Sequence, residues 1–399
     1  MPVLRILHVV PYYDEAWAYG GIPRLATAMT RGLARRGHEV TVCTTDACDA
    51  TSRAGPSQSR PGIPGLQVRV FPNLSNRLAY HWQLFAPLGL TAHLRTGAQH
   101  FDIAHLHACR NLPGVIAARA LRRCGVPYVI SPNGTAPAIE RRILAKHVFD
   151  WAAGRRTLAG SARVVAVTEA ESRQLRDLGI DVARIAVVPN PIDDDEQAIR
   201  PDPLHFRKVH RLGDAPLVLF LGKLTPRKGV DVLLRAFHQL ARPETTLVIA
   251  GNDMGSGSDI DALTAALNLQ GCTLRTGLLK GRERLDALAA ADVVVYPSRD
   301  EVFGLVAAEA LACGTPVVVC DDSGCGEIVA QVGGGIAVPH GDAARLADAI
   351  ALVLDSKEAW RARARTAGAL VRDRFGSTAV CQRLEAVYHD VLLQHGRAA

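Results

Sequence analysis

Short runs of apolar residues, separated by segments with helical periodicity, recur along almost the whole chain. In the first half these runs are "LRILHVV", "HEVTVCTT", "FDIAHLHA", "VPYVISP", "ARVVAVT" and "IAVVPN". In the second half they are "PLVLFLG", "TTLVIAG", "CTLRTG", "DVVVYPS", "TPVVVCD" and "GIAVP". Apolar strands that alternate with helices are typical of parallel sheets covered by helices on both faces. The pattern therefore predicts an α/β fold of doubly wound parallel sheets.

The pattern is interrupted near the middle of the chain. Residues 190–216 are polar, contain prolines and lack hydrophobic periodicity. A chain of 399 residues is also too long for one ordinary core and suits two domains. We therefore expect two Rossmann-like domains, 1–195 and 196–376, followed by a helical stretch, 377–399. Such sheets bind ligands outside the carboxyl ends of their strands, so the cleft between two facing domains is the expected site.

Composition is that of a globular protein, with 48% hydrophobic and 21% charged residues. No apolar run reaches the roughly 18 residues that span a bilayer. The N-terminal "MPVLRILHVVPYY" is typical of a strand and not of a secretion signal, so we expect a cytoplasmic protein. The nine cysteines are scattered and form no C-x-x-C pair, which favours buried thiols over a disulfide framework or a zinc site.

Positive charge is concentrated in the first half of the chain. Residues 1–200 contain 24 Lys and Arg against 16 Asp and Glu, a balance of +8, whereas residues 201–399 contain 22 against 23, a balance of −1. This asymmetry predicts an anionic partner for the first half, such as phospholipid headgroups or a lipid-linked diphosphate. The alternative is an ordinary set of solvated arginines. No nucleic-acid partner is expected.

Candidate phosphate-binding residues follow the predicted strands. In "FLGKLTPRKGVDVLLRAF", Gly222, Lys223 and Lys228 lie between a strand and a helix start, where ammonium groups and backbone amides suit a diphosphate. The alternative is a basic loop exposed to water. In "YGGIPR", Gly20 and Gly21 let backbone N–H groups approach a phosphate closely. The first strand is not followed by G-x-G-x-x-G, which argues against a dinucleotide-dependent oxidoreductase.

Two glutamates in the pattern E-x7-E follow the strand "DVVVYPS". Glu301 lies on the expected strand-end loop, and Glu309 lies in the second turn of the helix expected over "FGLVAAEALAC". Carboxylates accept hydrogen bonds from vicinal hydroxyls, which suits a sugar or a ribose. The first turn of this helix also offers backbone donors, from Phe303, Gly304 and Leu305. The alternative for Glu309 is a buried acid that caps a neighbouring loop.

The chain resembles the retaining glycosyltransferases of the GT-B fold, family 4, over nearly its whole length. The resemblance rests on the E-x7-E segment and on "FLGKLTPRKGVDVLLRAF", together with "VVPNPID", "SGCGEIV" and "GGIPRLATAMTRGLARRGHEVTVCTTD". The resemblance implies that Glu301 binds hydroxyls of the transferred sugar and that Glu309 holds the ribose of the nucleotide. It implies that Lys223 and Lys228 neutralise the diphosphate, assisted by Gly21 from the other domain. The co-substrate would be a UDP- or GDP-sugar.

The resemblance also implies a role for each domain. The N-terminal domain would bind the acceptor, the C-terminal domain would bind the nucleotide sugar, and the last helix, 377–394, would pack on the N-terminal domain. No metal or other cofactor is expected, because the lysines neutralise the leaving group and the second half lacks a D-x-D motif at a strand end. The predicted reaction transfers a hexosyl unit to a glycan or lipid-linked acceptor, in lipid-linked glycan, lipopolysaccharide or exopolysaccharide synthesis.

Two positions depart from the family pattern. The first basic residue of the phosphate loop is usually Arg, and Lys223 keeps the charge without the bidentate geometry. In "SPNGT", Asn133 stands where many relatives have a histidine near the reacting sugar. An amide can hydrogen-bond a hydroxyl but cannot act as a base. His105 and His107, in "AHLHA" at a strand end, are alternatives that would line the cleft, and His107 is equally interpretable as a structural histidine.

Residues 140–160, "ERRILAKHVFDWAAGRRTLAG", are expected to form a helix with cations beside large apolar side chains. Such a helix suits reversible attachment to an anionic membrane surface, and the alternative is a core helix with a solvated basic rim. Two other functions stay open, a non-catalytic nucleotide-sugar-binding protein and a nucleotide-sugar epimerase of similar fold. Release of nucleotide diphosphate in the presence of an acceptor would distinguish a transferase from these two alternatives.

Overall fold

The computed structural model describes residues 2–55, 63–137 and 143–397. The chain divides into two compact units. The first unit contains Met1–Asp193 and Ser377–Ala399, and the second contains Asp194–Gly376. The first unit is therefore built from two separate pieces of sequence, with the second unit inserted between them. Among the described residues, no helix is both long enough and apolar enough to cross a membrane.

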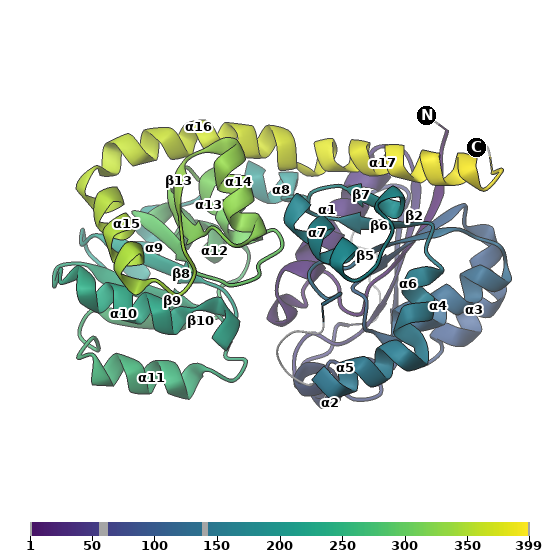
Figure 1. Ribbon diagram of the computed structural model, residues 1–399, viewed down its shortest axis with the longest axis horizontal. Helices are drawn as coiled ribbons and strands as arrows, with labels where there is room; N and C mark the ends of the chain where they lie inside the picture. The colour runs from purple at the N-terminus through teal and green to yellow at the C-terminus, as the bar shows by residue number, and fades with distance from the viewer. Residues whose placement is uncertain (1, 56–62, 138–142, 398–399) are drawn as a thin grey trace. The chain divides into compact units, whose positions relative to one another are not determined.

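The first unit is built on a parallel sheet, some of whose strands are labelled in Figure 1. The strand order is β3-β2-β1-β4-β5-β6-β7. Its strands are β1 (Arg5–Val9), β2 (Glu39–Thr45), β3 (Leu66–Phe71), β4 (Ile103–His107), β5 (Tyr128–Ser131), β6 (Arg163–Ala166) and β7 (Ile185–Val187). The order reverses between β1 and β4, which pair in register from Ile6↔Ile103 to Val9↔Leu106. In doubly wound sheets this switch point is where ligands bind, at the carboxyl ends of the strands.

One strand of this sheet, β3, was not predicted. It lies at the sheet edge beside β2, and its first four residues alternate between partial burial and exposure. Its sequence "LQVRVF" alternates apolar and polar residues, so it lacks the continuous apolar run by which the other strands were recognised. The central strand β4, by contrast, is buried at every residue.

Helices pack on both faces of the first sheet. Their bounds are α1 (Gly21–Arg35), α2 (Asn76–Trp82), α3 (Leu90–Gly97), α4 (Leu112–Arg123), α5 (Ile143–Phe149), α6 (Arg155–Ala159), α7 (Glu169–Asp177) and α17 (Ser377–Gln394), with short turns η1 (Trp17–Tyr19), η2 (Ala98–His100), η3 (Asp150–Gly154, a π-helical turn) and η4 (Val182–Arg184). On one face, α3 and α4 share an apolar cluster with β1, β4 and β5. Successive side chains of a strand point to opposite faces, so His105 on β4 points to the other face, where α17 packs.

Helix α17 belongs to the first unit by its contacts. Its Tyr388 hydroxyl lies 2.7 Å from the Nδ1 of His105. It packs against α1, where Cys381 Sγ donates a hydrogen bond to the carbonyl oxygen of Met29. A Cβ at Gly32 of α1 would lie 2.5 Å from Cys381 Sγ, so the close approach of the two helices depends on a glycine. The last helix therefore completes the cover of the first sheet.

The second unit is built on a parallel sheet with the order β10-β9-β8-β11-β12-β13. Its strands are β8 (Leu217–Leu221), β9 (Thr246–Ala250), β10 (Thr273–Gly277), β11 (Val293–Tyr296), β12 (Val317–Cys320) and β13 (Gly335–Val338). Its helices are α8 (Asp194–Ala198), α9 (Pro203–Val209), α10 (Val230–Leu240), α11 (Gly257–Ala266), α12 (Gly281–Ala290), α13 (Leu305–Ala312), α14 (Gly324–Val332), α15 (Ala343–Asp355) and α16 (Lys357–Phe375), with the turn η5 (Pro226–Lys228). The order reverses between β8 and β11. The predicted α/β fold of two doubly wound parallel sheets is confirmed.

Candidate functional site

The loops after β8 and β11 bring two of the predicted residues together. Lys228, in η5, forms an ion pair through its Nζ with the Oε2 of Glu301 and donates a hydrogen bond to the Tyr296 hydroxyl. The Tyr296 hydroxyl donates to the same Oε2 at 3.0 Å, and the Ser298 hydroxyl donates to it at 3.2 Å. Because β8 and β11 flank the point where the strand order reverses, these four polar groups converge where a ligand of this sheet is expected.

The charges around Glu301 keep its carboxylate ionised. Burial alone would raise the pKa of Glu301, but the charges of Lys228 and Arg227, with hydrogen bonds from Lys228 and Tyr296, lower it to about 2. Burial, and then the negative charge of Glu301, raises the pKa of Tyr296 well above its usual value. At neutral pH Glu301 is therefore a fixed hydrogen-bond acceptor and Tyr296 a fixed donor. An ionised carboxylate of this kind can accept hydrogen bonds from sugar hydroxyls.

Helix α13 begins at Leu305, later than the sequence predicted. Its N-cap residue is Gly304, with φ of 75°. A Cβ at Gly304 would lie 1.9 Å from Cys325 Sγ, so glycine is required both for the conformation and for the contact. Phe303 precedes the helix, is buried, and packs edge-on against Phe375 with ring centroids 5.5 Å apart. The prediction that the helix starts at Phe303 was therefore wrong, because the chain turns at Gly304 first.

Glu309 is only 2% exposed and has a partner that the sequence did not indicate. Its Oε2 forms an ion pair with Arg284 Nη1 of α12. Arg284 is 1% exposed, and its Nη2 forms a second ion pair with Glu196 at 2.6 Å. Glu309 and Glu196 thus share one buried guanidinium, and a hydrogen bond between charged groups contributes to stability. Glu309 therefore contributes to the packing of the second unit, and its assignment to a ribose stays a prediction.

Gly222 and Lys223 follow β8 directly. The N–H of Gly222 donates to the carbonyl oxygen of Ala250 at 2.9 Å, which extends the sheet hydrogen bonding to the end of β8. Lys223 is partly buried, and the N–H of Thr225 donates to its carbonyl oxygen at 3.1 Å. Lys223 and Lys228 therefore leave the same strand end within one loop. Their joint contact with a diphosphate stays a prediction.

In the first unit, Gly20 and Gly21 form the start of α1. Gly20 is the N-cap residue, with φ of 94° and ψ of −136°, a backbone conformation that residues with side chains rarely adopt. Because α1 follows the loop after β1, its first-turn N–H groups lie at the carboxyl edge of the first sheet. The two glycines lie where the sequence predicted them, and their contact with a phosphate stays a prediction.

Asn133 lies in the turn that follows β5, and its φ of 51° is in the left-handed region. Its Nδ2 donates to the carbonyl oxygen of Ser131 at 3.2 Å. Its Oδ1 is buried and has no hydrogen-bond partner within the described parts of the chain. The turn lies at the carboxyl edge of the sheet, one strand from the switch point between β1 and β4. This location is compatible with a substrate contact.

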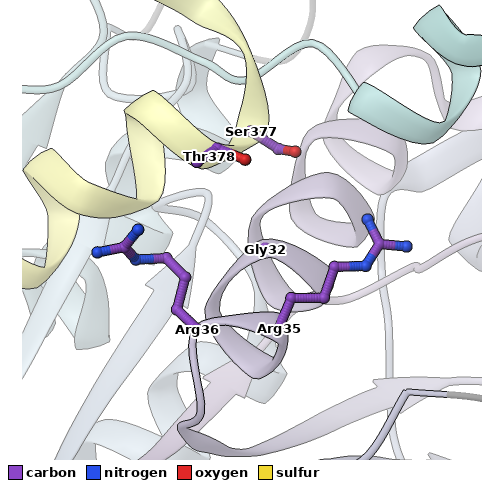
Figure 2. Close-up of a pocket in the computed structure, with 5 residues that line it drawn as sticks. All are labelled: Gly32, Arg35, Arg36, Ser377 and Thr378. Atoms are coloured by element: carbon purple, nitrogen blue, oxygen red, sulfur yellow. The ribbon is translucent and has the colours of Figure 1, made fainter.

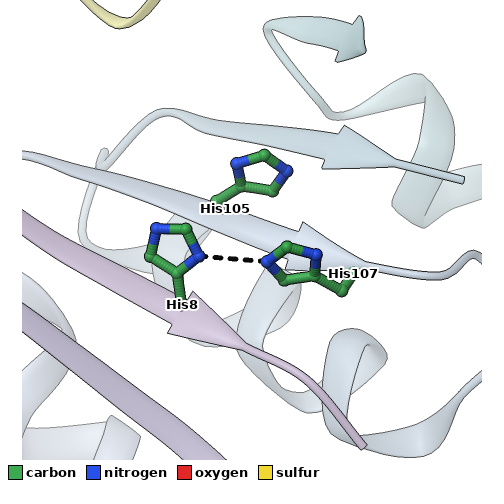
Figure 3. Close-up of side chains that lie close together, drawn as sticks. All are labelled: His8, His105 and His107. Carbon is green, nitrogen blue, oxygen red and sulfur yellow. Dashed lines mark hydrogen bonds between the residues drawn. The ribbon is translucent and has the colours of Figure 1, made fainter. Parts of the chain in front are cut away.

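His105 and His107 do not line a surface, because both are 0% exposed, as is His8. Figure 3 shows the two residues on one strand, β4, beside His8 on the neighbouring strand β1. The Nε2 of His107 lies 3.0 Å from the Nδ1 of His8, and His105 is hydrogen-bonded to Tyr388 and Ser131. Burial lowers the pKa of His107 to about 3. The prediction of cleft-lining histidines was wrong, because a central strand covered on both faces buries its polar residues as well. Burial favours the structural interpretation of His107, and a catalytic role for it stays a prediction.

The three buried histidines raise the question of a metal site. Ring nitrogens of His8, His105 and His107 lie within 4.8 Å of one another. The rings are stacked, however, and those of His105 and His107 lie 4° from parallel with centroids 4.5 Å apart. Imidazole lone pairs lie in the ring plane, so stacked rings direct them side by side and not toward one ion. Both nitrogens of His105 are also already hydrogen-bonded. The cluster fits stacking and hydrogen bonding better than metal ligation.

A pocket of about 400 Å³ lies between α1 and α17 (Figure 2). It is lined by Gly32, Arg35, Arg36, Ser377 and Thr378. Arg36 is already engaged in a bidentate ion pair with Glu385 of α17. Helices of doubly wound folds run antiparallel to their strands, so the end of α1 lies away from the carboxyl edge that carries Gly20 and Asn133. The pocket is therefore separate from the predicted site residues.

Sequence reasoning missed several residues that contact the predicted ones. Tyr296 and Ser298 belong to "DVVVYPS", and their position at the polar end of a buried strand was the same signal that identified Glu301. Arg227 precedes Lys228 directly and could have been included for its charge. Arg284 gave no such signal, because it lies within a helix whose pattern does not indicate which polar residue turns inward.

Family models match most of the chain in two parts. The model described as Glycosyltransferase Family 4 matches residues 19–196, and the model described as Glycosyl transferases group 1 matches residues 202–369. The D-inositol 3-phosphate glycosyltransferase of Acidothermus cellulolyticus is 33% identical over 407 residues, which cover 95% of this chain and 88% of that protein.

Solved structures show the same architecture. Sucrose-phosphate synthase from Thermosynechococcus elongatus matches with a TM-score of 0.77 at 21% identity, covering 98% of this chain and 99% of that chain. Anabaena HepE, solved in complex with UDP and glucose, matches with a TM-score of 0.76 at 20% identity, covering 97% of this chain and 100% of that chain. By sequence and by architecture, the chain belongs to glycosyltransferase family 4 and has the GT-B fold.

Proposed function

We propose that this chain is a retaining hexosyltransferase that moves a hexosyl unit from a UDP- or GDP-sugar to an acceptor hydroxyl. Family membership supports glycosyl transfer, and the Lys228–Glu301 pair at the switch point of the second sheet carries the assignment of roles. In the transfer, the acceptor oxygen bonds to the anomeric carbon while the bond from that carbon to the diphosphate oxygen breaks. The acceptor proton passes to the leaving phosphate oxygen.

In this proposal the second unit binds the donor. Diphosphate oxygens compete with Glu301 for Lys228, and the released carboxylate accepts hydrogen bonds from hydroxyls of the hexosyl unit. Negative charge on the diphosphate grows as the bond breaks, so Lys228, Lys223 and Arg227 stabilise the transition state more than the bound donor. These cations take the place that a divalent metal has in other transferases, so the reaction needs no metal. Glu309 contributes to ribose binding.

Two classes of acceptor fit the observations. The first is a hydroxyl of a glycan or lipid-linked precursor, as in lipopolysaccharide or exopolysaccharide synthesis, which suits the positive charge of the first half. The second is a phosphorylated cyclitol, since relatives such as that of Acidothermus cellulolyticus are named D-inositol 3-phosphate glycosyltransferases. For the donor, the likeness to HepE, solved with UDP and glucose, favours a UDP-sugar.

Turnover assays test the proposal. Purified protein would be incubated with UDP- or GDP-hexoses and with D-inositol 3-phosphate or lipid-linked glycan precursors, and release of nucleotide diphosphate would be measured. We expect release that depends on an acceptor, an α-linked product by NMR, and unchanged activity in EDTA. A β-linked product from an α-linked donor would exclude retention. Donor binding without release would indicate a non-catalytic protein, and interconversion of donors without an acceptor would indicate an epimerase.

We further propose that the enzyme works on the cytoplasmic side of a membrane and attaches to its anionic surface. The first support is the segment from α5 to α6. Leu144 is 82% exposed and Trp151 is 78% exposed, beside the cations Lys146, Arg155 and Arg156. Such side chains suit the interface between headgroups and acyl chains. Arg141 and Arg142, which the sequence also assigned to this surface, lie outside the described residues.

A second exposed apolar segment supports the same proposal. The large apolar residues of positions 74–88 that face solvent are Leu74, Leu78, Trp82, Leu84 and Leu88. Behind them, Ala79 and Phe85 pack in a buried cluster with Tyr12 and Tyr19 from the loop between β1 and α1. This segment therefore borders the carboxyl edge of the first sheet, as does the segment that follows β5. An enzyme with a lipid-linked acceptor would need its membrane contacts at that edge.

A further inference from the structure

The turn that carries Asn133 has a left-handed backbone conformation. Asn133 and Gly134 have φ of 51° and 77°, two consecutive residues in the left-handed region. Asn and Gly are the residue types that adopt this conformation most readily, so the pair suits a tight turn. The Oδ1 of Asn133 is buried and has no hydrogen-bond partner within the described parts of the chain, so the side chain itself does not stabilise the turn through that atom.

The turn is held instead by a carboxylate from another element. Glu171 lies in the first turn of α7 and is 0% exposed. Its Oε1 accepts a hydrogen bond from the N–H of Gly134 at 2.6 Å, and its Oε2 accepts one from the N–H of Val167 at 2.9 Å. Its own N–H donates to the hydroxyl of Thr168, the N-cap residue of α7, at 3.2 Å. One side chain thus joins the loop after β5 to the loop after β6.

A carboxylate is a costly choice for this position. Burial raises the pKa of Glu171 to about 7, against the opposing effect of its two backbone hydrogen bonds. Buried carboxylates are costly unless a compensating interaction is present. If the position only had to cap α7, the hydroxyl of Thr168 would already serve that purpose. What distinguishes Glu171 is its reach to Gly134 on the neighbouring loop.

The far side of the same loop is held by an arginine. Arg110 donates hydrogen bonds to the carbonyl oxygens of Thr135, Ala136 and Pro137. Its guanidinium also forms an ion pair with Asp150 of η3 at 2.6 Å. Glu171 and Arg110 therefore hold Gly134 and the three residues after it, and Asn133 precedes this anchored stretch at the carboxyl edge of the sheet.

We propose that Glu171 is a positioning residue of the transfer reaction, which acts by holding the Asn133–Gly134 turn in the conformation that presents Asn133 to the substrate. The inference rests on the proposed function, because it requires Asn133 to contact a substrate hydroxyl. Glu171 itself contacts no substrate. Its effect should therefore appear in kcat and pass through Asn133, while donor binding by the second unit is unaffected.

The test compares Glu171→Ala and Glu171→Gln with Glu169→Gln, which removes a charge from an exposed position in the same helical turn. We expect Glu171→Ala to lower kcat by roughly 100-fold, the size of effect that a displaced catalytic geometry produces. Glu171→Gln should recover part of the loss, since its amide oxygen can still accept from Gly134. Donor affinity, measured by calorimetry, should stay within a factor of about two for all three variants.

A double-variant comparison decides whether Glu171 acts through Asn133. If it does, Asn133→Ala/Glu171→Ala should be no slower than Asn133→Ala alone, because residues that act as a unit are not additive. Additive losses would overturn the inference, as would wild-type kcat in Glu171→Ala, or donor affinity and kcat falling together in both Glu171 variants. If the wild-type protein shows no turnover with any acceptor, the proposed function fails and this inference fails with it.

Discussion

Among single residues, Lys228 carries the clearest functional prediction. We expect Lys228→Ala to lower kcat by about 100-fold or more with a smaller loss of donor affinity, because the charge on the leaving diphosphate grows in the transition state. Lys208→Ala, which removes an exposed lysine of the same unit, is the matched control. Steady-state kinetics and donor calorimetry measure the two effects. Equal kcat in both variants would contradict the proposed role of the Lys228–Glu301 pair.

Glu309 is predicted to affect stability as well as binding. Glu309→Ala leaves the buried guanidinium of Arg284 paired with Glu196 but without one of its charge-assisted hydrogen bonds, so we expect a loss of about 1.5–3 kcal/mol in the free energy of unfolding. If the carboxylate also binds the ribose, donor affinity should fall by roughly 10- to 150-fold. Urea unfolding and calorimetry separate the two effects, with Glu358→Ala as an exposed control. Unchanged affinity in a folded variant would refute the ribose assignment.

Glu171 also predicts how stability depends on pH. Its pKa is raised from 4.5 to about 7 in the folded protein, so between these values the native state keeps a proton that the unfolded state has released. Stability contributed by this group therefore falls as pH rises from about 5 to about 8, by up to about 3 kcal/mol. Denaturant unfolding at both pH values should show this loss in the wild type and not in Glu171→Gln. Equal losses in the two proteins would contradict the raised pKa.

Among the elements, the segment from α5 to α6 is expected to bind membranes. Liposomes with anionic lipid should retain the protein at low salt and release it as salt rises, because the Debye length shortens from about 30 Å at 0.01 M to about 8 Å at 0.15 M. Replacing Leu144 and Trp151 by Ser should reduce retention. The control is Leu204→Ser/Leu352→Ser, which removes exposed apolar residues from the second unit. Sedimentation with liposomes measures both, and equal retention would exclude this segment as the contact.

The success of prediction differed between elements for a physical reason. Strands such as β11 and β12, "VVVY" and "VVVC", are buried at every residue. Their continuous apolar sequence therefore indicates burial on both faces. The edge strand β3 is only partly buried, and its alternation carried no such signal. Helix starts were less certain, because α13 begins only after the left-handed turn at Gly304, which local composition does not reveal.

Candidate site residues were predictable where their place after a strand determines the edge of the sheet at which they lie. Glu301 and Lys228 follow adjacent strands of the second sheet, and topology alone brings them to one edge. Their direct ion pair was not predictable, since it depends on side-chain directions within two loops. The partners of Glu309 and Glu171 were hidden for the same reason. The prediction that His107 lines a cleft was wrong, because a residue at the end of a central strand can be buried as easily as exposed.

For the whole molecule, donor identity can be tested through thermal stability. A ligand present at 100 times its dissociation constant adds about 2.7 kcal/mol to the stability of the unit that binds it. We expect a UDP-sugar to raise the melting temperature more than GDP- or ADP-sugars do. We expect two units with separate cores to unfold in separate transitions, and only the transition of the donor-binding unit should shift. A screen by differential scanning calorimetry reports this, and an equal shift for all three nucleotides would contradict a base preference.

The division of the first unit into two pieces of sequence has a consequence for biosynthesis. Domains generally fold as they emerge during synthesis, N-terminal first. Here the residues that complete the first unit are translated after the whole second unit. They include Tyr388, which is hydrogen-bonded to His105, and Glu385, which pairs with Arg36 and His38. Until the second unit has been made, one face of the first sheet is therefore covered by α1 but not by α17, and the apolar surface that stays exposed suits binding by chaperones. A stop codon shortly before α17 would spare every residue proposed to act in donor binding and catalysis, yet leave the core of the first unit incomplete.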